Sequence, residues 1–274
     1  MSYHQSLVDA LLRGDIDVST LIGYSPTQLS SYRKGGHAAD NGDASVAASE
    51  TVIPKEIEAK TSFGELLGDI NNGQKQCDMK EFENEEIYLI KDLLVQEECT
   101  SLITATESIG YGSTNYAKRY RGNLRLIVYD SSLADKLWSR LSTYFPTSIL
   151  EDGVWYEVVG LNECWRCAKY YPKDRFSTHV DTYYEDKKLQ LKSMFTINIY
   201  LNDCPDGSGG ETAFWLKGER TAIRPIAGLC LAFRQPTTKC YNHEGMELLD
   251  GLKYLIRSEV MYRKKPRTNM FFFF

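Results

Sequence analysis

Histidine is scarce in this chain: its 274 residues include only His4, His37, His179 and His243. Long apolar runs are also missing, because no stretch approaches the roughly 18 residues that a membrane-spanning helix needs. We recognise no signal peptide, so the sequence predicts an intracellular protein, cytoplasmic or nuclear, with no membrane partner. The seven cysteines are odd in number and irregularly spaced, which predicts reduced thiols rather than a disulfide framework.

Positive charge is in short supply as well. The formal net charge is −5 and the isoelectric point is about 5.5, so nucleic acid is not an expected partner. The stretch AKRYRGNLR (117–125) is a local basic patch, and it is more typical of a solvated loop. The isolated CWRC (164–167) lies in a strand-like segment, where its two thiols would face opposite ways. We therefore expect no metal or redox role for it.

Composition divides the chain into three parts. Residues 1–84 form an N-terminal extension, partly helical and partly a disordered linker rich in Ser, Gly, Ala and Asp. Within it, FGELLGDI (63–70) indicates a short helix or docking segment. Residues 85–264 form the folded domain, and residues 265–274 form a C-terminal tail.

The folded part predicts two helices followed by many strands. Apolar residues recur at helical spacing from Val95 to Ile103, and again in SSLADKLWSRLSTYF, which Ser131 or Ser132 would cap. After residue 153, short strand-like segments alternate with Gly- and Pro-containing turns. This order predicts a mainly β fold with flanking helices, built as an antiparallel sandwich or barrel.

One strand-like segment, MFTINIYL (194–201), has two distinct faces. Its apolar face carries Phe195, Ile197, Ile199 and Leu201, and its polar face carries Thr196, Asn198 and Tyr200. The polar face either meets solvent or lines a polar cavity inside a barrel.

The stretch FSTHVD suggests a metal site. His179 and Asp181 are two residues apart, so in a strand their side chains would point the same way. His243 is the only other histidine of the folded part. Two histidines and one carboxylate form the facial triad of non-haem Fe(II) oxygenases. The alternative is that these histidines are ordinary surface or packed residues and that the spacing arose by chance.

Two cations follow His243 on a strand-like run. Lys253 lies ten residues after it, and Arg257 would share the strand face of Lys253. A cation deep inside a barrel needs an anion, which a dicarboxylate cosubstrate would supply. Tyr200, on the polar face of its strand, is placed to donate a hydrogen bond to the same carboxylate.

These motifs, in this order, resemble the Fe(II)/2-oxoglutarate-dependent dioxygenases of the prolyl 4-hydroxylase-like family. The resemblance covers roughly residues 160 to 262, through GLNECWRCAKYYPKDRFSTHVD, MFTINIYLND, GGETAFW, IRPIAGLCLAF and NHEGMELLDGLKYLIRSEVMY. It implies a double-stranded β-helix, the jelly roll of cupin-like proteins, with helices from the 90–145 region packed on its outside. The glycine expected after the proline of the family's Y-x-P-G stretch is Lys173 here.

The resemblance also assigns residues to roles. It makes His179, Asp181 and His243 the iron ligands. The residues that it places at the 2-oxoglutarate site are Lys253, Arg257, Tyr200, Tyr170 and Thr196, with either Lys253 or Arg257 as the main carboxylate anchor. Arg121 and Asn123 resemble part of a substrate-facing loop, and a solvated loop is the alternative for both.

The implied activity is hydroxylation of an unactivated C–H bond, on a prolyl or other protein side chain, with release of succinate and CO2. The implied cofactors are Fe(II), 2-oxoglutarate and O2, with ascorbate as a further candidate. Two alternatives remain open: a small-molecule hydroxylase of the same class, and a non-enzymatic, metal-holding jelly-roll scaffold.

Overall fold

The described residues, 56–69, 79–81, 85–236 and 240–266 of a computed structural model, form two β-sheets. The strands of the larger sheet are β1 (Ile57–Lys60), β2 (Met79–Glu81), β3 (Ile87–Ile90), β4 (Gly112–Ser113), β5 (Leu124–Tyr129), β6 (Ser148–Glu151), β7 (Val154–Leu161), β8 (Cys164–Tyr170), β10 (Glu185–Asp186), β11 (Leu191–Tyr200), β14 (Cys230–Arg234) and β16 (Lys253–Lys264). The strands of the smaller sheet are β9 (Phe176–His179), β12 (Thr212–Leu216), β13 (Glu219–Ile223) and β15 (His243–Gly245).

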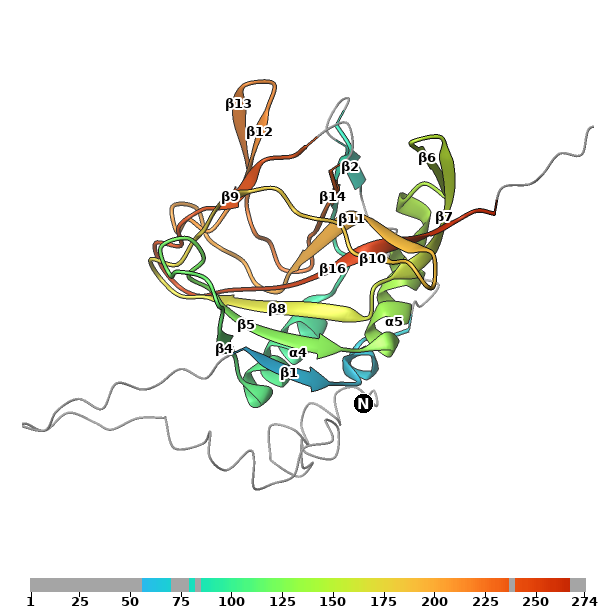
Figure 1. Ribbon diagram of the computed structural model, residues 1–274. Coiled ribbons are helices and arrows are strands. Elements are labelled where there is room, and N and C mark those ends of the chain that lie inside the picture. The colour runs from blue at the N-terminus through green and yellow to red at the C-terminus, as the bar shows by residue number, and fades with distance from the viewer. Residues whose placement is uncertain (1–55, 70–78, 82–84, 237–239, 267–274) are drawn as a thin grey trace, which may run out of the picture.

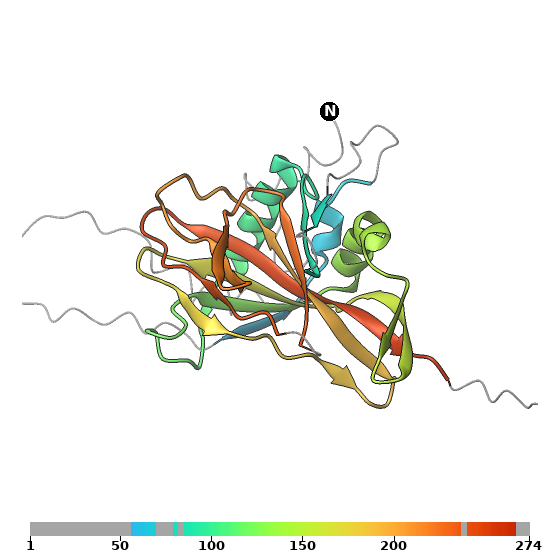
Figure 2. The same cartoon turned by 90° about the horizontal axis from the view of Figure 1, so that it is seen from above.

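The two sheets form the layers of a jelly roll. The main path of the larger sheet runs β1-β5-β8-β16-β11-β14-β3-β2, and the smaller sheet runs β13-β12-β15-β9. Helices α4 (Gln96–Ile109) and α5 (Ser131–Leu141) lie on the side of the larger sheet away from the smaller one (Figures 1 and 2). This architecture confirms the predicted fold class, a mainly β jelly roll with helices on its outside.

The faces of β11 explain where the interior lies. Phe195, Ile197 and Ile199 belong to a buried apolar cluster that the larger sheet shares with α4 and α5. The opposite face of β11 looks between the two sheets, where Tyr200 packs with Phe214 of the smaller sheet. The alternation predicted from the sequence is therefore present, and the polar face belongs to the interior rather than to solvent.

The capping of α5 differs from the prediction. Asp130, not Ser131 or Ser132, is the N-cap, and its Oδ1 accepts a hydrogen bond of 2.9 Å from the backbone N–H of Leu133. A serine cap was predicted because both serines have good cap chemistry, but an aspartate one residue earlier serves equally well. Ser132 instead donates its hydroxyl to the same carboxylate.

A segment before residue 85 packs into the domain. β1 pairs in parallel with β5, and the 3-10 helix η2 (Phe63–Leu66) buries Phe63 and Leu66 in the main core. The hydroxyl of Thr61 and the backbone N–H of Phe63 both donate to Oδ2 of Asp130. We therefore propose that the domain begins near residue 56.

Most of the remaining predictions for the chain ends cannot be compared with the structure. The helical segment predicted within residues 1–22, and the tail from residue 267 onward, lie outside the described residues. The linker was predicted over residues 23–62, and its described part is wrong as a linker, because Ile57–Lys60 form β1. In the part of the chain that the structure describes, no helix combines the length and apolar character needed to cross a membrane.

Asp130 links α5 to the segment before it, so its removal should be costly. We expect Asp130→Ala to lower the free energy of unfolding by about 2–3 kcal/mol, since a helix cap and three further hydrogen bonds are lost. Urea denaturation measures this change. Asp135→Ala, an exposed site on the same helix, is the matched control and should shift it by less than about 0.5 kcal/mol. Equal unfolding midpoints for the two variants would contradict the role of Asp130.

Candidate metal and cosubstrate site

Strand pairing brings the three predicted metal ligands together. His179 ends β9, His243 begins β15, and the two residues are direct partners in the antiparallel pair β9–β15. Asp181 lies just beyond the end of β9, not within it as predicted. Its Oδ1 is 3.6 Å from Nε2 of His179, and its Oδ2 is 4.0 Å from Nε2 of His243. One donor atom from each residue lies within 4.8 Å of the other two.

Both imidazoles are oriented for metal binding. Nδ1 of His179 is 2.8 Å from the carbonyl oxygen of Ser177, and Nδ1 of His243 is 3.0 Å from that of Tyr241. Hydrogen bonds to these carbonyls select the tautomer in which Nε2 carries the free lone pair. Burial lowers the pKa of His243 to about 4, so this side chain is neutral at physiological pH, the form in which imidazole binds metals.

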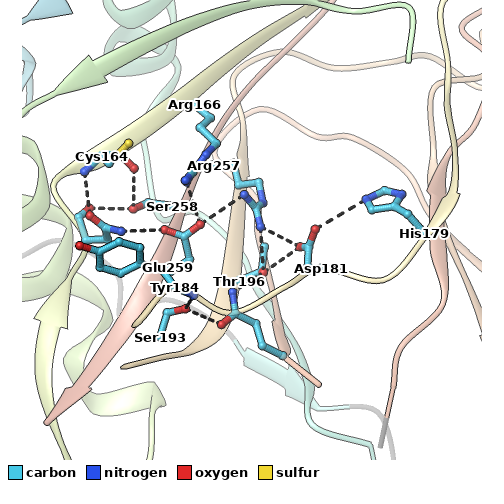
Figure 3. A network of polar contacts seen from close by, with 12 residues as sticks. Cys164, Arg166, His179, Asp181, Tyr184, Ser193, Thr196, Arg257, Ser258 and Glu259 are labelled. Carbon is cyan, nitrogen blue, oxygen red and sulfur yellow. Dashed lines mark hydrogen bonds and ion pairs between the residues drawn. The ribbon is translucent and has the colours of Figure 1, made fainter. Parts of the chain in front are cut away.

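The Asp181 carboxylate is held by the larger sheet. Its Oδ2 accepts a hydrogen bond of 2.8 Å from Thr196 on β11 and lies 3.0 Å from Nη2 of Arg257 on β16 (Figure 3). Burial alone would raise the pKa of Asp181, but Arg257, His179 and His243 together outweigh burial and hold it well below the usual range. One oxygen is thus fixed and the other faces His179. Two imidazoles that present Nε2 and an ionised carboxylate fit a divalent iron site.

The two cations predicted at the cosubstrate site occupy different places. Lys253 is fully buried, and its Nζ donates a hydrogen bond of 2.5 Å to the carbonyl of Gly210. Among the described residues, no carboxylate forms an ion pair with this ammonium, although the charge of Glu211 acts on it from further away. Arg257 instead pairs with Asp181 and Glu259. Lys253 is therefore the cation still able to receive a carboxylate.

Aromatic rings and one glycine form the surroundings of Lys253. Its Nζ lies 5.1 Å from the ring centroid of Tyr170 and 5.5 Å from that of Tyr200. Gly210 has a φ of +80°, and a Cβ there would meet a side-chain carbon of Leu248 at 3.0 Å. Burial lowers the pKa of Lys253 to about 8.

Sequence reasoning missed Thr212 in this group. The hydroxyl of Tyr200 donates a hydrogen bond of 2.8 Å to Oγ1 of Thr212, and Thr212 rather than Tyr200 lines the cavity. Thr212 begins β12 in the GGETAFW stretch, which the resemblance covered without assigning a role to the threonine. Thr196 is also absent from the cavity lining, since it lies behind Asp181.

A cavity of about 470 Å³ joins these groups. Its lining includes all three candidate metal ligands, together with Lys253, Arg257 and Tyr170. Its rim carries four partly exposed tyrosines, Tyr116, Tyr120, Tyr183 and Tyr184. The cavity therefore extends from a buried cation, past the candidate metal ligands, to a surface between two loops.

The basic patch 117–125 contributes directly to this cavity. Arg121 and Arg125 both line it, so the prediction of a solvated loop is wrong for these two side chains. The guanidinium carbon of Arg121 lies 4.3 Å from the ring centroid of Phe176, which stacks on His179 at 3.7 Å. Asn123 is buried outside the lining, and its Oδ1 accepts a hydrogen bond of 3.0 Å from Nε of Arg121. Asn123 thus supports Arg121 rather than facing the cavity.

The two cysteines of CWRC have different surroundings. Cys167 belongs to the main apolar cluster, where burial raises the pKa of its thiol, and Cys164 is partly exposed. The two thiols face opposite sides of β8, as the strand period requires.

Comparison with known proteins gives a family match in the same region. Residues 165–258 match the family model of the 2OG-Fe(II) oxygenase superfamily, in agreement with the resemblance drawn from the sequence. No curated protein matches the chain.

Several solved structures are similar to the chain. A viral collagen prolyl hydroxylase from Paramecium Bursaria Chlorella virus-1 has 21% identity and a TM-score of 0.49, covering 66% of this chain and 98% of its own. A Pseudomonas putida prolyl-4-hydroxylase has 14% identity and a TM-score of 0.47, covering 67% and 95%. A Trichoplax adhaerens prolyl hydroxylase, in complex with a hypoxia inducible factor peptide fragment, has 16% identity and a TM-score of 0.44, covering 65% and 84%.

The contact between Thr196 and Asp181 leads to a test of the metal site. We expect Thr196→Val to weaken Fe(II) binding about tenfold, because the carboxylate loses a group that orients it. His179→Ala should lose a donor atom and bind the metal far more weakly still. Anaerobic calorimetric titration with Fe(II) measures both affinities. Thr104→Val, on the exposed side of α4, is the control, and wild-type affinity in Thr196→Val would contradict the orienting role.

Proposed function

We propose that this chain, whose residues 165–258 match the family model of the 2OG-Fe(II) oxygenase superfamily, hydroxylates an unactivated C–H bond of a protein side chain, in the manner of a prolyl hydroxylase. Succinate and CO2 are the co-products, and O2 is the oxidant. The family match confirms the predicted reaction class, a 2-oxoglutarate-dependent dioxygenase, and the use of Fe(II) and 2-oxoglutarate. Ascorbate stays a prediction.

The observation that carries this proposal is the position of Lys253. A buried ammonium without a carboxylate partner lies at one end of a cavity, and His179, Asp181 and His243 line the same cavity. A lowering of the pKa from 10.5 to about 8 corresponds to roughly 3 kcal/mol of unfavourable free energy at neutral pH. A dicarboxylate that reaches both the metal and Lys253 would offset that cost.

The site residues have three proposed roles: metal binding, cosubstrate binding and positioning of a metal ligand. His179, Asp181 and His243 would hold the iron, which supplies the oxidation that couples cosubstrate decarboxylation to hydroxylation. Lys253 would bind the far carboxylate of 2-oxoglutarate, with the Thr212 hydroxyl beside it. Arg257 would keep Asp181 ionised and oriented. We thus assign the anchor role to Lys253 and a positioning role to Arg257.

The shape of the cavity supports a protein substrate. Its exposed lining residues include Tyr116 and Tyr120 from one loop and Tyr183 and Tyr184 from another, and we infer that the cavity opens to solvent at these loops. A small-molecule hydroxylase is the second candidate, because a volume of about 470 Å³ also lies in the range of small-molecule pockets. A non-enzymatic scaffold would have no use for the buried charge of Lys253.

Cosubstrate binding to the Fe(II)-loaded protein tests the proposal. Anaerobic titration with 2-oxoglutarate should produce a weak visible metal-to-ligand charge-transfer band in the wild type, and no band in His179→Ala. Asp206→Ala, an exposed carboxylate away from the cavity, is the control and should give the wild-type band. Iron bound without any band in the wild type would refute cosubstrate chelation at this site.

The pKa of Lys253 gives a second test with a definite sign. Only the protonated ammonium attracts a carboxylate, so the Kd for 2-oxoglutarate should rise about tenfold per pH unit above pH 8. Lys253→Met should bind 2-oxoglutarate weakly at every pH.

The lowered pKa of Lys253 in the folded protein also predicts an effect on stability. Below pH 8 the buried lysine is charged and destabilises the fold. The metal-free Lys253→Met protein should therefore melt at a higher temperature than the wild type at pH 7.

Calorimetry between pH 7 and 9.5 and thermal melting provide the two readouts. Lys264→Met, an exposed lysine on the same strand, is the matched control and should leave both the affinity and its pH dependence unchanged. A Kd that is flat from pH 7 to 9.5 in the wild type would argue against Lys253 as the anchor.

A further inference from the structure

Three arginines converge on one wall of the cavity. Arg125 on β5, Arg166 on β8 and Arg257 on β16 come from adjacent strands of the larger sheet and all line the cavity. Arg166 and Arg257 are direct partners in the antiparallel pair β8–β16. Like charges at directly opposed positions destabilise a sheet unless anions neutralise them. We call Arg125, Arg166 and Arg257 the arginine row.

The protein supplies few anions for this row. Oε1 of Glu259 lies 2.8 Å from Nη1 of Arg166 and 3.2 Å from Nη1 of Arg257, so one carboxylate serves two guanidinium groups (Figure 3). Arg257 also pairs with Asp181, a candidate metal ligand. Arg125 pairs with Glu56. Burial, together with the charges of Arg166 and Arg257, lowers the pKa of Arg125, as expected for crowded cations.

Arg121 adds a further cation at the mouth side of the row. Its Nε is bound by Asn123, and its guanidinium lies over the ring of Phe176. Within the described residues, its terminal nitrogens make no hydrogen bond and meet no carboxylate. A guanidinium that faces a cavity with its two terminal nitrogens unpaired can bind a planar or tetrahedral oxyanion.

The charge balance of the loaded cavity remains positive. Its cationic lining residues are Arg121, Arg125, Arg166, Lys253 and Arg257, and its carboxylates are Asp181 and Glu259. A divalent metal and the dianion of 2-oxoglutarate would cancel each other. Even with Glu56 counted against Arg125 and Glu211 against Lys253, cations outnumber anions among these largely buried groups, where unbalanced charge is costly. The remaining molecule that could bring negative charge is the substrate.

We propose that the substrate presents an oxyanion, a carboxylate or phosphate group, to Arg121 and Arg166 beside the C–H bond that is hydroxylated. This inference rests on the proposed function, because the subsite adjoins the metal and cosubstrate positions assigned there. A neutral prolyl ring would leave the terminal nitrogens of Arg121 without a partner, and Arg166 with only the carboxylate of Glu259 that it shares with Arg257. The preferred substrate is therefore acidic at or next to the reacting position.

Binding to a catalytically silent complex tests this substrate class. The protein is loaded with Mn(II), which accepts similar donor atoms, and with saturating 2-oxoglutarate so that Lys253 is occupied. Capped tripeptides Gly-X-Gly, with X as Asp, Glu, phosphoserine, Asn, Gln, Ser or Pro, are titrated calorimetrically. Free aspartate, glutamate, asparagine and glutamine form a second arm. Binding of 2-oxoglutarate to the Mn(II) protein is measured first.

We expect acidic members to bind about tenfold to a hundredfold more tightly than their neutral counterparts, since charge-assisted hydrogen bonds are lost in the amides and in serine. Arg121→Gln and Arg166→Gln should each reduce that preference about tenfold or more. Arg175→Gln, an exposed arginine outside the cavity lining, should retain it. Preference in the peptide arm identifies a protein substrate, and preference confined to the free acids identifies a small one.

The outcomes separate this inference from the proposed function. If 2-oxoglutarate fails to bind the Mn(II) protein, the proposed function and this inference both fall. If it binds but neutral members, including Pro, bind as tightly as acidic ones, or no member of the panel binds, only the oxyanion subsite is overturned. The comparison of acidic and neutral members in the wild type requires no variant, so misfolding of Arg166→Gln cannot obscure it.

Discussion

The ion pair between Asp181 and Arg257 is the interaction on which the rest of the site depends. Asp181 follows β9 of the smaller sheet, and Arg257 lies on β16 of the larger one, so the pair connects the two layers of the jelly roll. Loss of one partner would leave a largely buried charge uncompensated, which typically costs about 3–5 kcal/mol. With Thr196, Arg257 also decides which carboxylate oxygen faces His179. Fold stability and ligand geometry therefore rest on the same contact.

Much of this interior is unfavourable for the protein on its own. Lys253 is buried without a carboxylate, and Arg166 shares Glu259 with Arg257. Apolar residues at these positions would pack at lower cost. A cavity that retains so many cations is better suited to anionic ligands than to stability, which is the usual compromise at functional sites. The cations that lack a carboxylate of their own lie in two places, and we propose one anion subsite at Lys253 and another along the arginine row.

Sequence reasoning succeeded where the signal was local. The alternation in MFTINIYL placed Ile197 and Asn198 on opposite faces, because the strand period of two needs no knowledge of neighbours. The structure puts Ile197 in the core and Asn198 in the cavity lining, a choice that the sequence left open. The HxD spacing and the lone His243 likewise brought together three side chains that the structure places within reach of one metal ion. Strand β1 was missed because IEAK is short and has little apolar character.

The features that escaped prediction depend on pairing between distant strands. The sequence does not show that Arg166 stands opposite Arg257, since that register joins residues about ninety positions apart. Thr212 was overlooked for the same reason, because its importance comes from Tyr200 and Lys253 on other strands. The basic patch 117–125 was interpreted as surface, since its loop chemistry gave no indication that Arg121 and Arg125 turn inward.

The distribution of the site over two layers has a mechanical consequence. His179 and His243 belong to the smaller sheet, whereas Lys253 and Arg257 belong to the larger one. Under the proposed assignment, 2-oxoglutarate would contact residues of both sheets at once and connect the two layers. The separation of the sheets would then be set by the length of a five-carbon diacid, so shorter or longer diacids would have to strain the protein in order to bind. The distance between the two sheets of the jelly roll would then select the cosubstrate by its length.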